Sequence, residues 1–332
     1  MQNDLTPKRI LEIGLAFQMA KVLLSAVELG LFTLLASGPM TREQISARLD
    51  LTMTRPRMIG DWLDALVSMD FLLRRGEQYL NSPAAYLYLV EGKDDYPGDM
   101  LGMANARMYP AWGNLTQALR TGGGAWFETM QRDPQQLGKF LKGMRGRSAG
   151  ISRYIAELPW WRLCSTVGDA GCAEGATLAR IASHNQHLTG WGLDHPEVAP
   201  HFAEYIAARD LADRIHFVPG DFFKQPLPKA DAIILGRVLH DWDWEKKMQL
   251  LKNAYDALPK DGMLIVYDVL IDNERRENTH ALLTSLNIAL DTSGGFDYTP
   301  TECIGWMQQA GFRDFQVYLP TYLAEGVIVA TK

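Results

Sequence analysis

CSTVGDAGCAEG, residues 164–175, is the stretch that decides the fold of the second half of the chain. A short apolar run leads into a turn with glycines at positions 171 and 175, and a helical pattern begins directly after it. A strand that passes through a glycine-rich turn into a helix is typical of the first unit of a parallel α/β sheet. The glycines let the backbone turn sharply and approach a ligand closely before the helix starts.

Apolar runs rich in valine and isoleucine continue this pattern, and helical stretches separate most of them. The runs are residues 187–194, 214–221, 230–236, 262–271, 312–320 and 323–332, and the helical stretches are residues 174–183, 196–209, 243–258 and 275–291. Strands alternating with helices predict an α/β fold with a Rossmann-like, doubly wound and largely parallel sheet. The last two runs are close enough in sequence to form an antiparallel hairpin.

Acidic residues stand at the ends of two of these runs. Asp194 closes the second strand, where a carboxylate can accept hydrogen bonds from both hydroxyls of a ribose. Asp221 and Phe222 follow the third strand and pair an acceptor with an aromatic face that suits an adenine. Alone, Asp194 is explained by a helix cap and Asp221 by a turn. Because the carboxyl ends of parallel strands meet at one edge, their joint occurrence predicts a nucleoside-binding site there.

A histidine follows the fourth strand in LGRVLHDWD, residues 235–243. A histidine with an ordinary pKa of about 6.5 is largely neutral at pH 7 and can accept the proton of a hydroxyl group. Most single histidines are structural, but His240 lies at the same sheet edge as the acidic residues. We therefore expect His240 to act as a general base, and Asp241 to cap the following helix with Trp242 packed beneath it.

The first 98 residues have a different character, because they read as helices followed by a short hairpin around residues 75–77, which is a winged-helix arrangement. The Thr-x-x-Gln pattern from Thr41 is a capping box that starts one of these helices. This segment has ten Lys and Arg against twelve Asp and Glu, whereas a DNA-binding module has to neutralise phosphates. An association or lid module is favoured for residues 1–98, and residues 99–332 are expected to form the second domain with a helical pocket segment at 99–158.

Composition agrees with a globular protein of two domains, since the 332 residues are 47% hydrophobic and 22% charged. The net charge of −6 gives no basic surface for nucleic acid or an acidic membrane. Three widely spaced cysteines argue against disulfides and for a reducing compartment. The most apolar early segment, Val22 to Ala36, includes Glu28 and is too short to span a bilayer, so a cytoplasmic location is expected.

DAGCAEG, GLDHPEV, GDFF, LGRVLHDWD, LIVYDVLI and GGFDYT resemble, in this order, the motifs of S-adenosylmethionine-dependent O-methyltransferases. The resemblance is to the caffeic acid and hydroxyindole O-methyltransferase type and its bacterial relatives, and it covers nearly the whole chain. It implies a class I methyltransferase fold, a homodimer formed through the N-terminal domain, S-adenosyl-L-methionine as cofactor and a small hydroxylated aromatic or polyketide-like substrate. It implies no metal, nucleic acid or membrane partner.

The resemblance also implies roles for individual residues. The loop around the methionine part of the cofactor corresponds to Asp169, Gly171 and Gly175. The ribose site corresponds to Asp194, and the adenine site corresponds to Asp221 and Phe222. The catalytic base corresponds to His240, and its carboxylate partners correspond to Asp268 and Asp297. Met144 corresponds to a methionine near the reacting methyl group, and His280 lies on a helix that faces the substrate in the family. Asn105, Met108 and Trp112 are further pocket candidates.

Three departures from the family pattern leave other functions open. Gly236 stands where a cofactor-binding lysine is frequent, and Arg237 is expected to point to the opposite face of the strand. Cys172 and Ala173 replace glycines, and both carboxylate partners of His240 are one methylene shorter than glutamate. The alternatives are carbon or nitrogen methylation or non-methylating chemistry with the same fold and cofactor, and a winged-helix regulator that senses the cofactor.

Overall fold

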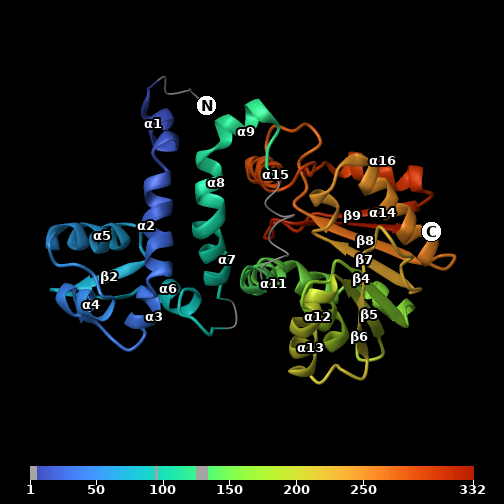
Figure 1. The fold of residues 1–332 in the computed structure, drawn as a ribbon, viewed down its shortest axis with the longest axis horizontal. Helices are drawn as coiled ribbons and strands as arrows, with labels where there is room; N and C mark the ends of the chain where they lie inside the picture. The colour runs from blue at the N-terminus through green and yellow to red at the C-terminus, as the bar shows by residue number, and fades with distance from the viewer. Residues whose placement is uncertain (1–5, 94–95, 125–133) are drawn as a thin grey trace. The chain divides into compact units, whose positions relative to one another are not determined.

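The structure is a computed structural model that describes residues 6–93, 96–124 and 134–332. The chain divides into two compact units, residues 1–110 and residues 111–332, and each is described by itself (Figure 1). The division lies after Pro110, beyond the domain boundary at residue 98 that the sequence suggests.

The first unit consists of helices and a small antiparallel sheet in the order β1-β3-β2. Its helices are α1 (Lys8–Gly14), α2 (Phe17–Glu28), α3 (Leu31–Leu35), α4 (Arg42–Arg48), α5 (Pro56–Ser68), α6 (Pro83–Tyr88), α7 (Gly98–Met103), the π-helix η1 (Ala104–Met108) and the start of α8 (Tyr109–Gly113), and its strands are β1 (Met40–Thr41), β2 (Leu72–Arg75) and β3 (Gln78–Asn81). The expected hairpin is β2–β3, and β1 extends it. The Thr41 capping box is present, with Thr41 Oγ1 accepting from the Gln44 amide.

The segment after residue 98 joins the first unit because its helices pack against α2. Asn105 makes this connection with both ends of its side chain: Oδ1 accepts from Lys21 Nζ at 2.5 Å, and Nδ2 donates to Glu28 Oε2 at 2.6 Å. Lys21 also lies over the ring of Tyr109, 5.5 Å from its centroid. These contacts account for a division after Pro110 rather than at residue 98.

The second unit is built around a seven-stranded sheet in the order β6-β5-β4-β7-β8-β10-β9. Its strands are β4 (Thr166–Ala170), β5 (Thr189–Asp194), β6 (Ile215–Pro219), β7 (Ala232–Gly236), β8 (Met263–Asp268), β9 (Arg313–Tyr318) and β10 (Gly326–Thr331). Strands β4 to β8 are parallel, and β10 runs antiparallel to both β8 and β9. The doubly wound sheet and the C-terminal hairpin that the sequence predicts are confirmed.

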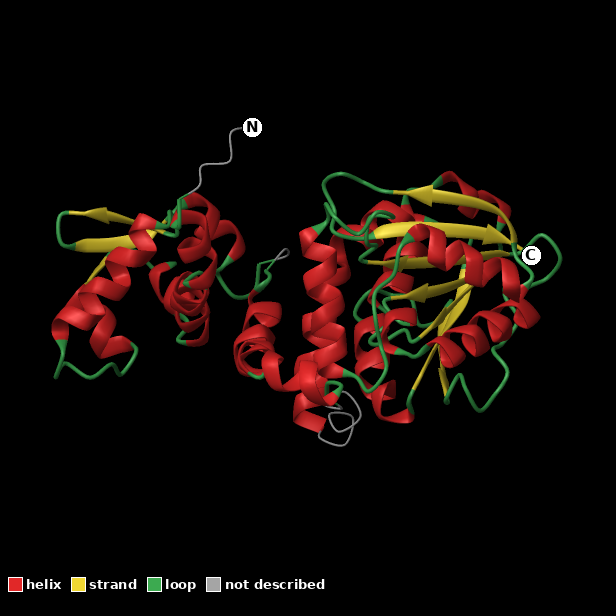
Figure 2. Ribbon diagram, turned by 90° about the horizontal axis from the view of Figure 1, so that it is seen from above, coloured by secondary structure: helices red, strands yellow, loops and turns green. Residues whose placement is uncertain are grey.

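Helices cover both faces of this sheet (Figure 2). Those packed against it are α11 (Pro134–Ala156), α12 (Ala176–His184), α13 (Ala199–Ala207), α14 (Trp244–Ala257) and α16 (Pro300–Ala310). The unit also contains α9 (Leu115–Thr121), α15 (Thr279–Asp291) and the short 3₁₀ turns η2 (Pro159–Leu163), η3 (Pro196–Val198) and η4 (Leu239–Asp241). Alternate residues of one strand serve two separate cores, as the twofold period of a strand requires. In β7, Ile233 and Leu235 join the core with α14 and α16, while Ala232 and Ile234 join the core with α11, α12 and α13.

Two helices differ from the sequence expectation. Helix α16 was not anticipated, although Thr299 and Glu302 form a capping box and Pro300 occupies the first helical turn. Helix α15 begins at Thr279 rather than at residue 275. The Asp272 carboxylate accepts hydrogen bonds from the amides of residues 276, 277 and 278, which holds this segment in a turn.

Candidate active site

The order of the strands reverses between β4 and β7, because the chain runs from β4 outward through β5 and β6 and then returns to β7. Ligands of open α/β sheets bind at such a switch point, beyond the carboxyl ends of the strands. Asp169 lies in β4, Asp194 ends β5, and η4 with His240 follows β7. The topology therefore brings these three residues to the same edge.

The turn after β4 requires residues that tolerate a left-handed backbone. Gly171 has φ 84° and Gly175 has φ 78°, and Ala173 between them also has a positive φ of 49°. A Cβ atom at Gly171 would lie 2.5 Å from Val238 Cγ2, and one at Gly175 would lie 2.6 Å from the Phe202 ring. Conformation and close packing both select glycine at these two positions.

Asp194 fixes this turn from the neighbouring strand. Its Oδ2 accepts from the Ala173 amide and its Oδ1 from the His195 amide, both at 2.8 Å. A carboxylate has about four acceptor positions, so each oxygen retains capacity for a ligand hydroxyl. Asp194 thus has the fixed orientation that recognition of a diol needs.

Two acidic groups at this turn have raised pKa values. Burial, together with the nearby charge of Asp194, raises the pKa of Asp169 to about 7. Burial also raises the pKa of Asp194, although the two amide hydrogen bonds act in the opposite direction. A cation or several hydroxyl donors beside these carboxyl groups would stabilise their charged forms.

The end of β6 supplies an aromatic surface. Asp221 Oδ1 accepts from the Phe223 amide at 2.9 Å, and Phe222 packs edge-on against Trp242 with ring centroids 6.1 Å apart. Within the described part of the chain, the buried Trp242 Nε1 has no hydrogen-bond partner.

The expectation that Asp241 caps the next helix is wrong. Asp243 has that role, since its Oδ1 accepts from the Lys246 amide at 2.9 Å.

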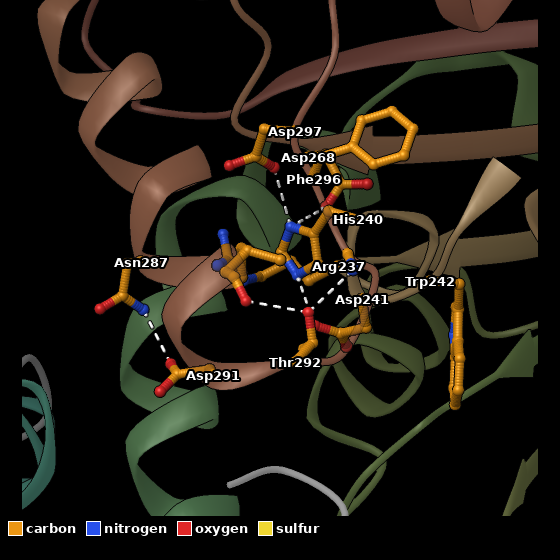
Figure 3. A network of polar contacts seen from close by, with 12 residues as sticks. Arg237, His240, Asp241, Trp242, Asp268, Asn287, Asp291, Thr292, Phe296 and Asp297 are labelled. Atoms are coloured by element: carbon orange, nitrogen blue, oxygen red, sulfur yellow. Dashed lines mark hydrogen bonds and ion pairs between the residues drawn. The ribbon is translucent and has the colours of Figure 1, made fainter. Parts of the chain in front are cut away.

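His240 is buried among three carboxylates (Figure 3). Its Nδ1 lies 3.0 Å from Oδ1 of both Asp268 and Asp297, and its Nε2 lies 3.5 Å from Asp241 Oδ1. The hydrogen-bond geometry favours Asp297 as the acceptor, while Asp268 accepts from the Tyr298 hydroxyl with its other oxygen. Aspartate therefore reaches the imidazole despite being shorter than glutamate.

The carboxylates change the acid–base properties of the histidine. Burial alone would lower the pKa of His240, but the charges of Asp268 and Asp241 and the hydrogen bond to Asp297 outweigh burial and raise it to about 10. The pKa of Asp268 is lowered, because the imidazolium and the Tyr298 hydroxyl more than offset its burial. The surrounding carboxylates thus favour the protonated form of His240, whereas the sequence suggests a histidine with an ordinary pKa.

Gly236 has a packing explanation in this structure. A Cβ atom there would lie 2.1 Å from Cζ of Tyr267, whose ring occupies the space beside β7. The Tyr267 hydroxyl is held 2.9 Å from Thr177 Oγ1 on α12. Arg237, which has φ 55°, is buried and forms an ion pair with Glu325 at 3.3 Å. A lysine at position 236 is incompatible with this placement of Tyr267.

The expected pocket residues are distributed over both units. Asn105 and Met108 belong to the first unit, and their role in a pocket stays a prediction. In the second unit, Trp112 Nε1 donates to Asn287 Oδ1 at 3.1 Å, which places it against α15. His280 is exposed on α15 and shares a helical face with Asn287, seven residues further on. Met144 lies half-buried in α11.

Sequence reasoning did not single out two buried residues of this site, Lys247 and Tyr298. Lys247 is fully buried and lies between the His240 segment and Phe296, donating to a backbone carbonyl on each side. The signal was present, because Lys247 occupies the same helical stripe as the apolar residues Leu250, Leu251 and Ala254. A lysine within an apolar stripe indicates a buried charge that needs partners.

Comparisons with known proteins agree with this architecture. Residues 113–313 match the O-methyltransferase domain, and residues 11–91 match the O-methyltransferase dimerisation domain. The tetracenomycin polyketide synthesis 8-O-methyl transferase TcmO of Streptomyces glaucescens is 38% identical, covering 93% of this chain and 92% of its own. The N,N-dimethyltransferase OxyT of Streptomyces rimosus is 34% identical, covering 98% and 96%.

The fold similarity extends over the whole chain. The crystal structure of human N-acetylserotonin methyltransferase in complex with SAM superposes with a TM-score of 0.90 at 28% identity, covering 100% of this chain and 99% of that one. The domain matches, these relatives and the shared fold lead to one conclusion. The chain belongs to the O-methyltransferase family.

Proposed function

We propose that this enzyme transfers the methyl group of S-adenosyl-L-methionine to a hydroxyl group of an aromatic or polyketide-like small molecule, with His240 as the general base. The observation that carries the proposal is the contact of His240 Nδ1 with Asp268 and Asp297 at 3.0 Å. Carboxylates on Nδ1 fix the orientation of the ring and stabilise its protonated form. The similarity to a polyketide 8-O-methyl transferase supports the choice of acceptor.

The residues at the sheet edge fit the cofactor. S-Adenosylmethionine supplies an electrophilic methyl group on a sulfonium, and it also carries an ammonium and ribose hydroxyls. Asp194, held by two backbone amides, is suited to the ribose, and the buried Asp169 is suited to a cationic group. Asp221 and Phe222 would lie beside the adenine, next to Trp242 Nε1, a donor that has no hydrogen-bond partner among the residues the structure describes. Gly171 and Gly175 let the backbone of the turn approach the methionine part.

The raised pKa of His240, about 10, determines how the proton is handled. A phenol has a pKa of about 10, so proton transfer between such a hydroxyl and the imidazole costs little free energy. At neutral pH both partners are protonated when separate, so formation of the reactive pair releases one proton to solvent. The remaining proton on His240 is held by the surrounding carboxylates while the oxygen is aligned with the methyl carbon.

The substrate pocket is proposed to include α15 and the segment that precedes it. His280 supplies a titratable ring from α15, and Trp112 supplies an indole ring that is hydrogen-bonded to Asn287 of the same helix. Met144 supplies a polarizable side chain from α11. Aromatic and methionine side chains suit a flat apolar acceptor.

A nitrogen acceptor is the second candidate, because the relative OxyT is named as an N,N-dimethyltransferase at 34% identity. An amine with a pKa below neutrality would need no base, so its methylation would not depend on His240. The two candidates therefore separate in one experiment, in which the His240→Ala variant is offered a phenol and an aromatic amine in turn.

We further propose that the enzyme is a cytoplasmic homodimer. Residues 11–91 match a dimerisation domain, and apolar side chains of the N-terminal helices are exposed, namely Ile10, Leu11, Ile13, Leu15, Phe17 and Met19. Lys8–Glu28 is long and apolar enough by length and composition to cross a membrane, with a mean hydropathy of 1.7, and it is a different segment from the Val22–Ala36 run judged too short in the sequence. We propose that a second copy of the chain, rather than a membrane, covers these exposed apolar side chains. Sedimentation of the purified protein without detergent tests this, and a monomer would contradict it.

The experiment that tests the activity is a screen of phenolic compounds with the purified protein and S-adenosylmethionine. Mass spectrometry should detect S-adenosylhomocysteine and a product heavier by one methyl group in equal amounts. Product with methyl on carbon or nitrogen, or S-adenosylmethionine binding without turnover across the panel, would contradict O-methylation.

A further inference from the structure

Lys247 is an unusual residue because its side chain is completely buried in a unit whose other lysines are largely exposed. It lies in the first turn of α14, on the stripe of the helix that faces the sheet core. Burial of an ammonium group is costly unless hydrogen bonds and charges compensate it. Its contacts therefore indicate what the charge does.

The ammonium lies between two backbone segments of the site. Lys247 Nζ donates to the carbonyl of Trp242, and it donates to the carbonyl of Phe296 at 3.2 Å. It also lies 3.5 Å from the centre of the Phe296 ring and 5.9 Å from those of Tyr298 and Trp306. Three aromatic rings and two carbonyl oxygens thus replace the water around the cation.

Each of these two carbonyl groups is close in sequence to one of the hydrogen-bonded residues His240 and Asp297. Trp242 is two residues after His240, and Phe296 directly precedes Asp297. His240 and Asp297 are 57 residues apart in sequence, and a hydrogen bond of 3.0 Å joins their side chains. Lys247 connects the two backbones on which this hydrogen bond depends.

We propose that Lys247 is a positioning residue, whose ammonium ties the His240 segment to the Asp297 segment and so holds the imidazole in its reactive orientation. The proposal rests on the proposed role of His240 as the base. Lys247 acts through backbone carbonyls and touches neither substrate nor cofactor in this account. Hydrogen-bonded partners that orient metal-binding side chains contribute about 10–100-fold to activity, and we expect an effect of similar size here.

The nearby carboxylates favour the charged form of Lys247. Burial lowers the pKa of Lys247 to about 8, and the charges of nearby carboxylates oppose this effect. The acidic groups that act on it are Asp268, Asp241, Asp297 and Asp243. An ammonium donates to both carbonyls at once, which a neutral side chain of the same length without N–H groups cannot do.

The test compares Lys247→Met with Lys252→Met, a control on the exposed face of the same helix. Methionine keeps the apolar stem and removes the donors and the charge. We expect kcat of Lys247→Met to fall about 10–100-fold, while the Kd for S-adenosylmethionine measured by calorimetry stays within twofold and Lys252→Met behaves as the wild type. Wild-type kcat in folded Lys247→Met, or an equal loss in Lys252→Met, would overturn the proposal.

A second pair of measurements distinguishes positioning from a general effect on folding. In the double variant Lys247→Met/Asp297→Asn, the loss of kcat should be no larger than that of Asp297→Asn alone, because both changes release the same imidazole. Losses that multiply would refute the coupling. Lys247→Gln, which keeps two uncharged donors, replaces Lys247→Met if the latter does not fold, with a smaller loss of kcat expected and wild-type kcat again contradicting the proposal.

Failure of this inference is separable from failure of the proposed function. If His240 is not the base, His240→Ala keeps its turnover whatever Lys247→Met does. If His240 is the base and Lys247 does not position it, His240→Ala loses turnover while Lys247→Met keeps it.

Discussion

His240 Nδ1 lies 3.0 Å from the carboxylate oxygens of both Asp268 and Asp297, so one N–H group faces two acids. Asp297 accepts the hydrogen bond, and Asp268 contributes its charge from the same distance while it binds the Tyr298 hydroxyl. The two contributions differ in kind, because Asp297 orients the ring and Asp268 mainly raises its pKa. Substitutions can separate them.

Asp268→Asn should lower the pKa of His240 and reduce the kcat reached at alkaline pH, where His240 is deprotonated, because a full charge that stabilises the imidazolium formed during proton transfer is lost. We expect a reduction of about 10–100-fold, with the affinity for S-adenosylmethionine unchanged. Steady-state kinetics with a phenolic acceptor measure the effect, and Asp256→Asn on the exposed surface of α14 is the control. If both variants retain wild-type kcat, Asp268 does not support the base.

Activity should rise toward alkaline pH. Because the pKa of His240 is raised to about 10, kcat/KM for an acceptor with a hydroxyl pKa of about 10 should increase continuously from pH 6 to 9. An ordinary histidine would give a limb with its midpoint near pH 6.5. A plateau above pH 7.5 would therefore contradict the raised pKa.

The same shift affects stability with a defined sign. A group whose pKa is higher in the folded state stabilises the fold below its unfolded pKa, and this contribution is lost as the pH rises through the folded value. The stabilisation from His240 should be complete below pH 6.5 and disappear by about pH 10. The difference in unfolding free energy between wild type and His240→Gln, measured with urea at several pH values, checks this. A difference that grows with pH would have the wrong sign.

Asp194→Ala should weaken cofactor binding without changing the fold of the sheet. Loss of hydrogen bonds from a charged carboxylate to the ribose costs about 1.5–3 kcal/mol, which corresponds to an affinity about 10–100-fold lower. Calorimetry with S-adenosylmethionine and S-adenosylhomocysteine measures it. Normal affinity for both would remove Asp194 from the ribose site.

Gly236→Ala should destabilise the protein, because the added methyl group would lie 2.1 Å from the Tyr267 ring. Overpacking of this kind costs about 1–3 kcal/mol. Gly305→Ala is the matched control, since nothing lies within 4 Å of a Cβ there and alanine favours the helix α16. Urea denaturation should order the variants as Gly305→Ala, wild type and Gly236→Ala, from most to least stable. Equal stability of Gly236→Ala and wild type would show that Tyr267 moves away freely.

The sheet was predictable from sequence because its strands are short apolar runs bounded by glycine and aspartate, and because the pattern changes period between strands and helices. The acidic edge was predictable for the same reason, since Asp194 ends β5 and Asp221 follows the parallel neighbour β6. The roles of Asp268 and Asp297 came from family resemblance. Their meeting at His240 depends on the order of strands β7 and β8 and on the loop after α15, which sequence spacing does not specify.

Other features depend on three-dimensional packing alone. In the sequence, Gly236 marks the loss of a cofactor-binding lysine. In the structure, the Tyr267 ring of the neighbouring strand β8 leaves no space for a side chain at position 236. The raised pKa of His240 requires the distances to three carboxylates, and no single motif carries them. Two further features could have been predicted from the sequence. The apolar stripe of α14 indicates that Lys247 is buried, and the capping box of Thr299 and Glu302 indicates the start of α16.

The most direct test of the account is the turnover of His240→Ala with a phenolic acceptor, measured beside its affinity for S-adenosylmethionine. We predict that kcat falls about 10²–10⁴-fold, the usual contribution of general-base catalysis, while the Kd for the cofactor stays within twofold. Wild-type kcat with the same acceptor would contradict the central claim that His240 is the base.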